Sequence, residues 1–274
     1  MSVIFASSTC DLDNKTLKKV GIDIINIPLI VNDKKCLYSA DKFSFDEYYA
    51  TNECVVDEDK YKKILNTKFL EALNSGQDVL FLTPNAKYDN SYKYVKDIIK
   101  QLAPNYPEQK VEMVNCGNYS LGYGLIVYEA GILNIRGENI TEVIKFVNKI
   151  KHGIKTYIIP SDLTYVQKKL TLVGSTIGVK PVIEVSNAEL KLVDKVRGKK
   201  KMIDYFAGLI NNNSHELPVS IMCGKNADEA LALEEIVLAD SKDRQIFKAT
   251  LNPLFLNKFG NKTLSISFYK KSKK

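Results

Sequence analysis

Residues Gly174–Lys201, GSTIGVKPVIEVSNAELKLVDKVRGKKK, predict a β-hairpin that leads through a basic turn into a helix. The turn signal Ser186-Asn187-Ala188 has apolar residues on both sides, and Leu190 and Leu192 alternate with charged residues, as in a half-buried strand. After Lys201, apolar residues return at helical spacing. A hairpin followed by a helix is typical of an α+β domain, so this stretch decides how the second half of the chain folds.

The basic turn itself has two interpretations. Lysines in the first turn of a helix lie at the positive end of the helix dipole, which disfavours cations there by a few tenths to about 1 kcal/mol. One interpretation is a solvated basic face, and the other is a docking surface for an acidic partner or a phosphate. The residues concerned are Lys195, Arg197, Lys199, Lys200 and Lys201.

The first half of the chain alternates extended apolar runs with amphipathic segments, which is typical of a parallel sheet covered by helices. The expected strands are Val3–Ala6, Ile24–Val31, Asp78–Thr83, Val111–Asn115 and Thr156–Pro160. The expected helices are Asn14–Val20, Asp59–Leu73, Asn90–Leu102, Ser120–Leu133 and Thr141–Lys151. Ser120–Leu133 is apolar nearly all round, so we expect it to be buried. The predicted fold class is α/β, with an N-terminal parallel-sheet (Rossmann-like) domain over residues 1–158 and a C-terminal α+β domain over residues 159–274.

Composition excludes several classes of function. The net charge of +7 is concentrated in the basic turn and in the final KKSKK, and the rest of the 274 residues is slightly acidic, unlike a nucleic-acid-binding surface. The five cysteines are widely spaced and His152 and His215 are the only histidines, so we expect neither a disulfide framework nor a metal site. No apolar run approaches the roughly 20 residues that span a bilayer, and Met1–Phe5 resembles an opening strand more than a leader. We therefore expect a cytoplasmic protein.

Candidate binding residues come from three loops at the expected carboxyl ends of the parallel strands, where doubly wound sheets bind their ligands. Each loop carries hydroxyl or amide groups just before a helix, a position that suits a carboxylate or a phosphate. The alternative for Ser120, as for Asn118, is a helix cap. Gly122 and Gly124 lack the rest of a dinucleotide fingerprint, and no P-loop occurs, so we expect no nucleotide cofactor. The candidates are Ser8, Thr9, Asn85, Ser91 and Ser120.

Several motifs, taken in order, resemble those of the DegV family. Ser7–Leu12 is similar to the family's TDSTCDL, and Ile27-Pro28-Leu29 to its IPL strand. Further matches, spread over nearly the whole chain, are Phe45–Tyr49, Ser120–Gly124, Gly178–Val182, Lys195–Lys201 and Asn252–Phe255. The resemblance implies a two-domain α/β protein that holds one fatty acid between its domains and presents the carboxyl group to a kinase subunit. It also implies that the protein itself does no chemistry, and that the ligand is the fatty acid with no further cofactor.

The chain departs from the family where the ligand would be held. Cys54–Asp57 stands where the family has TSQP, whose threonine hydrogen-bonds the acyl carboxyl group, and Asn85–Tyr92 stands in place of S-S-x-L-S-G-T-Y. Lys258 occupies the histidine position of the family's H-T-G-P-G segment. We hypothesise that Lys258, with Lys87, supplies a point charge for an anionic headgroup. The alternative is that Lys258 is an ordinary surface lysine.

Three functions follow from these observations. The first is a carrier for a fatty acid or a related anionic lipid, with the headgroup at the loop residues and Lys258, and with the basic turn facing a partner such as a fatty acid kinase subunit. The second is a diverged scaffold or protein-docking module that no longer binds fatty acid. The third is an enzyme, in which acid–base chemistry would fall to Asp11, Asp57 or Asp89 because no candidate loop contains a histidine.

Overall fold

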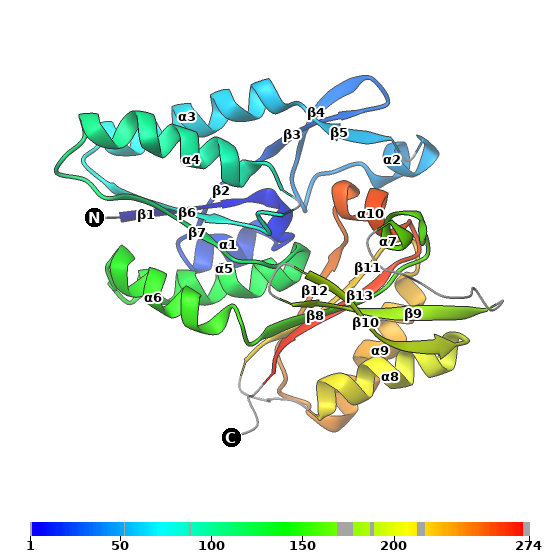
Figure 1. Ribbon diagram of the computed structural model, residues 1–274. Coiled ribbons are helices and arrows are strands. Elements are labelled where there is room, and N and C mark those ends of the chain that lie inside the picture. Colours follow the sequence, from blue (N-terminus) through cyan, green and yellow to red (C-terminus); the bar gives the residue numbers. More distant parts are fainter. Residues whose placement is uncertain are drawn as a thin grey trace.

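The described strands form three sheets, and helices pack against them (Figure 1). The structure is a computed structural model that describes residues 2–51, 53–87, 89–168, 178–186, 189–212 and 217–270. It confirms the predicted class, an α/β fold with a parallel sheet in the first half and a second, separate sheet-rich part.

The parallel sheet is built from the first half of the chain, as its apolar runs predict. Its order is β2 (Asp23–Ile25), β1 (Ser2–Ser7), β6 (Asp78–Thr83) and β7 (Val111–Asn115), with Val3 opposite Val79 and Val79 opposite Val111. Figure 1 shows helices on both faces. On one side lie α3 (Glu58–Asn74) and α4 (Ser91–Leu102), followed by the short η2 (Ala103–Asn105), and on the other α1 (Asn14–Lys19), α5 (Ser120–Ile135) and α6 (Ile140–Ile150).

The extended run Ile24–Val31 divides between two sheets. Its start belongs to β2, whereas β3 (Ile27–Val31) pairs with β4 (Lys34–Tyr38) and β5 (Cys54–Val56) in a small antiparallel sheet. The aromatic helix α2 (Phe45–Thr51) lies between β4 and β5 along the chain. The inner face of β5 carries Cys54 and Val56, while Val55 is exposed.

The mixed sheet contains the predicted hairpin. Its order is β10 (Glu189–Arg197), β9 (Val179–Ser186), β8 (Ile154–Ile159), β13 (Leu264–Tyr269), β11 (Val219–Cys223) and β12 (Ile246–Thr250). Its helices are α7 (Thr164–Gln167), α8 (Lys199–Asn211), α9 (Ala227–Asp240) and α10 (Pro253–Phe259). In the hairpin, Glu189 pairs with Ser186 and Arg197 with Val179. Residues 174–177 and 187–188 of the stretch that predicted it lie outside the described residues.

The expected strand at Thr156–Pro160 forms as β8 but joins a different sheet from the one predicted. It is antiparallel to both β13 and β9 and has no partner in the parallel sheet among the described strands. An almost fully apolar strand looks the same in sequence whichever sheet buries it, so the pattern alone could not assign its partners. The division at residues 158 and 159, which falls inside β8, stays a prediction.

Helix α5 lies between the parallel sheet and the mixed sheet, which explains why it is apolar nearly all round. It packs on β11, β13 and β8 as well as on η1 (Ser8–Cys10). Two of its glycines permit this contact. A Cβ on Gly122 would lie 2.2 Å from the Thr156 hydroxyl, and one on Gly124 would lie 2.4 Å from the carbonyl oxygen of Cys10. The G-x-G of this helix therefore serves close packing.

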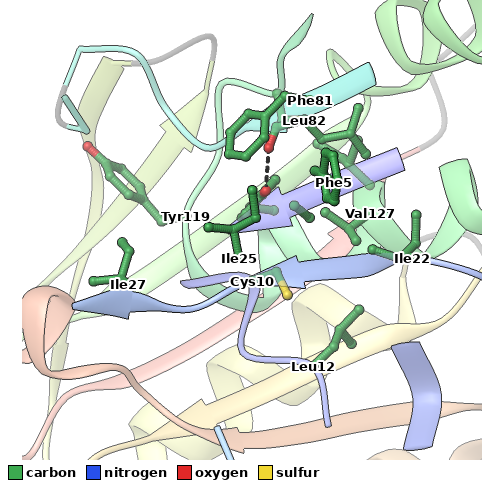
Figure 2. Packing of buried hydrophobic residues seen from close by; sticks show 14 of the residues in the cluster. Phe5, Cys10, Leu12, Ile22, Ile25, Ile27, Phe81, Leu82, Tyr119 and Val127 are labelled. Atoms are coloured by element: carbon green, nitrogen blue, oxygen red, sulfur yellow. Dashed lines mark hydrogen bonds between the residues drawn. The ribbon is translucent and has the colours of Figure 1, made fainter. Parts of the chain in front are cut away.

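The main hydrophobic core extends from the parallel sheet across α5 to α10. Figure 2 shows part of it, with Phe5 of β1, Leu82 of β6 and Val127 of α5 among other apolar side chains. Ile27 and Tyr119 lie at one margin of the group drawn in Figure 2. Both residues line cavities at the edge of the core.

Candidate functional site

Two adjoining cavities lie where α10 meets the loops of the parallel sheet. The larger has a volume of about 250 Å³ and the smaller about 40 Å³, against the ~10–15 Å³ that one water requires. Asp89, Leu254 and Lys258 line both. The larger is also lined by Ile27, Cys54, Val56, Glu58, Tyr61, Asn90, Ser91, Tyr94 and Asn257, and the smaller by Thr9, Pro84, Tyr119, Ser120, Asn252 and Phe255.

These linings bring all three predicted loops together. Thr9 follows β1, Asp89 and Ser91 follow β6, and Ser120 follows β7. Parallel strands end at a common sheet edge, which places their loops side by side. The second half of the chain closes the site from the other side with Leu254 and Lys258 of α10 (Figure 1).

Two hydroxyls in the lining of the larger cavity are buried and have no hydrogen-bond partner of acceptable geometry among the described residues. They are those of Ser91 and Tyr61, each only 1% exposed. The side-chain nitrogen of Asn85 is also buried and also lacks a hydrogen-bond partner among the described residues. A buried polar group without a partner costs about 1–3 kcal/mol. Such groups beside a cavity are therefore suited to receive a polar ligand.

Lys258 is half-buried and sits among aromatic rings, unlike an ordinary surface lysine. Its ammonium lies 5.8 Å from the centre of the Tyr119 ring and 6.0 Å from that of Tyr165, within cation–π range. Burial lowers the pKa of Lys258, and the nearby Asp89 carboxylate opposes that shift. Burial in turn raises the pKa of Asp89, while the hydrogen bond from the backbone N–H of Ser91 and the charge of Lys258 act to lower it.

Asp11 is buried, and two of its hydrogen-bond partners, Ser120 and Asn252, line the smaller cavity. Its carboxylate accepts hydrogen bonds from Tyr38 at 2.7 Å, from Asn252 at 2.8 Å and from the Ser120 hydroxyl. Burial raises the pKa of Asp11 to about 7 even though these three donors act to lower it. Ser120 has a φ of +46°, and neither it nor Asn118 caps α5, whose N-cap is Tyr119 without a side-chain bond. Ser120 thus holds Asp11 and does not serve as a simple cap.

The remaining candidates of the first two loops are placed differently. The Ser8 hydroxyl accepts a hydrogen bond from the backbone N–H of Ile27 at 3.0 Å, which ties η1, directly after β1, to β3. The hydroxyl of Thr9 is 3.0 Å from that of Ser7 at the edge of the smaller cavity. Asn85 is fully buried and accepts from the backbone of Lys87. Lys87 itself is exposed and pairs with Glu189 at 3.2 Å, and it is not among the residues that line the two cavities, whereas Lys258 lines both.

The basic turn lies away from the cavities. Lys195 and Arg197 are exposed on β10, and Lys199, Lys200 and Lys201 are exposed at the start of α8. Helix α8 packs on the face of the mixed sheet opposite α10 (Figure 1). Lys199 lies 3.6 Å from Glu229, and Lys200 pairs with Asp204 at 2.7 Å. The headgroup candidates and the docking candidates are therefore on different sides of this sheet.

Other reactive groups give no second site in the part of the chain that is described. Cys10 is fully buried, which raises the pKa of its thiol to about 12 and makes it unreactive. The Asp57 carboxylate caps α3 and lies 3.2 Å from Lys35. No cluster suited to a metal occurs among the described side chains, and His215 lies outside them. Within the same residues, no helix is long and apolar enough to cross a bilayer.

Comparison with known proteins identifies the family. The family model described as "Uncharacterised protein, DegV family COG1307" matches residues 2–271. The chain belongs to the DegV family. This match confirms the resemblance of its motifs.

DegV relatives share its length and fold but little of its sequence. A DegV domain-containing protein of Clostridium perfringens is 22% identical over 251 residues, or 86% of each chain, and one of Caldanaerobacter subterraneus is 22% identical over 226 residues, or 76% of each. Among solved structures, DegV of Bacillus subtilis, described as a fatty acid binding protein, aligns with a TM-score of 0.81 at 16% identity over 98% of this chain and 99% of its own. A stearic acid-binding protein of Eubacterium ventriosum aligns with a TM-score of 0.82 at 14% identity over 99% of both chains.

Three residues of this DegV site were not among the headgroup candidates drawn from the sequence. Tyr61 lies on the apolar face of α3, where its spacing is that of a core residue. The position of Asn252 before Pro253 is typical of a helix cap, and Asn252 does cap α10. Its side-chain amide also donates a hydrogen bond to Asp11. Asp89 was recognised only as a possible catalytic acid, whereas the structure places it beside Lys258. Its place in the loop after β6, two residues before Ser91, was the signal that could have pointed to it.

Proposed function

We propose that this DegV protein binds a single-chain anionic lipid, a fatty acid or a close relative, with its polar end at Ser91 and Lys258. The acyl chain would lie between the small sheet, α3, α4 and α10, where the larger cavity is. The single observation that carries this proposal is the pair of buried, unpartnered hydroxyls of Ser91 and Tyr61 beside the ammonium of Lys258. The described ligands of DegV relatives, stearic acid among them, support it.

The energetics of such binding divide between chain and headgroup. Each methylene that leaves water contributes about 0.8 kcal/mol, so the acyl chain supplies most of the affinity. The headgroup contributes specificity, because a charge-assisted hydrogen bond from Lys258 is roughly twice as strong as one from a neutral hydroxyl. Of the candidates from the sequence, Ser91 and Lys258 would contact the headgroup directly. Thr9 and Ser120 would face the headgroup from the smaller cavity. Asn85 and Ser8 would support the loops around it, Ser8 through its hydrogen bond with Ile27.

We further propose that the protein is a cytoplasmic carrier that does no chemistry and presents its lipid to a partner such as a fatty acid kinase subunit. The partner would contact Lys195, Arg197, Lys199, Lys200 and Lys201 through an acidic surface. Because these residues lie on the far side of the mixed sheet from the cavities, the partner would have to extend around the edge of that sheet to reach the headgroup. Glutamate substitutions at Lys195, Arg197 and Lys201, which leave the pairs of Lys199 and Lys200 intact, are expected to abolish partner binding without changing lipid affinity.

The first test is native mass spectrometry of the purified protein, followed by organic extraction and identification of the released lipid. A stoichiometric fatty acid is the expected result. Lys258→Met is then expected to weaken oleate binding by about 10- to 100-fold, with Lys87→Met as the matched control because Lys87 is exposed and pairs elsewhere. A protein that stays free of lipid after incubation with oleate and with palmitate would refute the carrier function and favour the diverged docking scaffold.

A further inference from the structure

Asp89 places a carboxylate inside the site where the lipid headgroup is proposed to bind. With Leu254 and Lys258 it is one of the residues that line both cavities. One oxygen of Asp89 accepts the backbone N–H of Ser91 at 2.8 Å, which fixes the side chain at the start of α4.

The positive charge of Lys258 is already offset before any ligand enters. Lys258 of α10 is the cation that lines the cavity, and its charge is offset by Asp89. Glu58 at the start of α3 adds a second acidic group at the exposed rim, where it accepts a hydrogen bond from Asn90. Tyr61 and Tyr94 are neutral, and Asp11 is separated from the cavity by Ser120 and Asn252. An ionised fatty acid would therefore bring an unbalanced negative charge into a partly buried site.

Two carboxylates that share a site cannot both ionise without a large cost, and one of them retains a proton. Resting on the proposed function, we propose that a fatty acid binds here with the uptake of one proton, which is held between its carboxyl group and Asp89. The proton comes from solvent and forms an O–H···O⁻ hydrogen bond between the two groups. The remaining negative charge is balanced by Lys258, and no covalent bond changes.

This arrangement makes the site selective for carboxylic acids. A free aliphatic carboxyl group ionises at a pH of about 4–5, so near neutral pH the proton must be taken up on binding. Above the ionisation range of Asp89 in the free protein, each unit of pH increase weakens binding by about tenfold. An alkyl sulfate of equal length cannot accept the proton, because its conjugate acid is far too strong. Asp89 therefore weakens the binding of an alkyl sulfate at neutral pH.

The test is isothermal titration calorimetry of oleate into the full-length protein at pH 7.5, in two buffers that differ in ionisation enthalpy. The difference in observed heat gives the number of protons taken up, and about one per oleate is expected. Asp89→Asn is expected to bring this number close to zero, to tighten oleate binding at pH 7.5 and to remove the pH dependence. Asp97→Asn, which changes an exposed carboxylate within α4, the helix that follows Asp89, is the matched control and is expected to behave as the wild type.

Hexadecyl sulfate provides a second measurement. The wild type is expected to bind it at least tenfold more weakly than palmitate at pH 7.5, and Asp89→Asn is expected to bring the two affinities together. Oleate binding without proton uptake, or uptake that persists in Asp89→Asn, would overturn the role of Asp89 while leaving the carrier function standing. Failure of the wild type to bind oleate at any pH would instead overturn the carrier function. If Asp89→Asn does not fold, the buffer dependence of the wild type still decides whether a proton is taken up.

Discussion

The side-chain amide of Asn252 donates a hydrogen bond of 2.8 Å to the carboxylate of Asp11, across 241 residues of sequence. Asn252 caps α10, which carries Lys258, and Asp11 ends the first loop of the parallel sheet. The bond therefore joins the two sides of the cavities directly. Tyr38 and Ser120 donate to the same carboxylate, so four segments of the chain meet at one buried charge.

Asn252→Ala is expected to destabilise the protein more than Asn139→Ala does. Asn139 is an ordinary cap of α6 that accepts two backbone N–H groups, and its loss should cost about 1 kcal/mol. Asn252 caps α10 through Phe255 and also serves Asp11, so its loss should cost about 2–4 kcal/mol. Urea unfolding of both variants measures the difference. Equal losses would show that the bond to Asp11 adds nothing.

Tyr38→Phe is expected to destabilise the protein more at pH 8 than at pH 5. The pKa of Asp11 is raised to about 7 in the folded protein, above its value of about 3.9 in an unfolded chain. Folded stability contributed by this group therefore falls as the pH rises from about 4 to about 7, and the full cost of the buried charge is present above 7. Tyr38 reduces that cost by donating to the ionised form. We expect a loss of about 1 kcal/mol at pH 5 and about 2–3 kcal/mol at pH 8, measured by chemical unfolding; a pH-independent loss would contradict this.

Gly122→Ala and Gly208→Ala are expected to change stability in opposite directions. An added Cβ at Gly122 would meet the Thr156 and Ser267 hydroxyls at 2.2 and 2.8 Å, so α5 would have to move and the cost should be about 1–3 kcal/mol or more. At Gly208, inside α8, no atom lies within 4 Å of the added Cβ among the described residues. There alanine should stabilise by about 0.5–1 kcal/mol. The melting temperatures of the two variants provide the comparison.

Tyr61→Phe and Tyr123→Phe make the same chemical change in two different settings. The Tyr123 hydroxyl donates to Leu82 at 2.5 Å and accepts from Ser7 at 3.0 Å, so its removal should cost about 1–3 kcal/mol. The Tyr61 hydroxyl has no such partner in the described part of the chain, and its removal should leave the stability of the ligand-free protein unchanged within about 0.5 kcal/mol. Oleate titration of Tyr61→Phe should nevertheless show weaker binding. A large stability loss together with unchanged oleate affinity would mean that Tyr61 is a core residue only.

Local patterns were sufficient for most of the secondary structure. The strands Asp78–Thr83 and Val111–Asn115 were predicted with the bounds that they have, and α5 was recognised as buried because it is apolar on every side. The loops at the carboxyl ends of the parallel strands were also predictable, because strand direction alone brings Thr9, Ser91 and Ser120 to one edge. These features depend on residues that are neighbours in sequence or on a general rule of sheet topology.

The sequence by itself determined the family, the α/β class and the loops that surround the site, because periodicity and ordered motifs are properties of short segments. Only the tertiary structure decided that β8 joins the mixed sheet, that Asp11 binds Asn252, and that Asp89 and Lys258 share one cavity while the basic turn lies on the far side. Each of these depends on contacts between segments distant in sequence. Burial and charge balance arise only when the chain brings such segments together, so no local pattern records them.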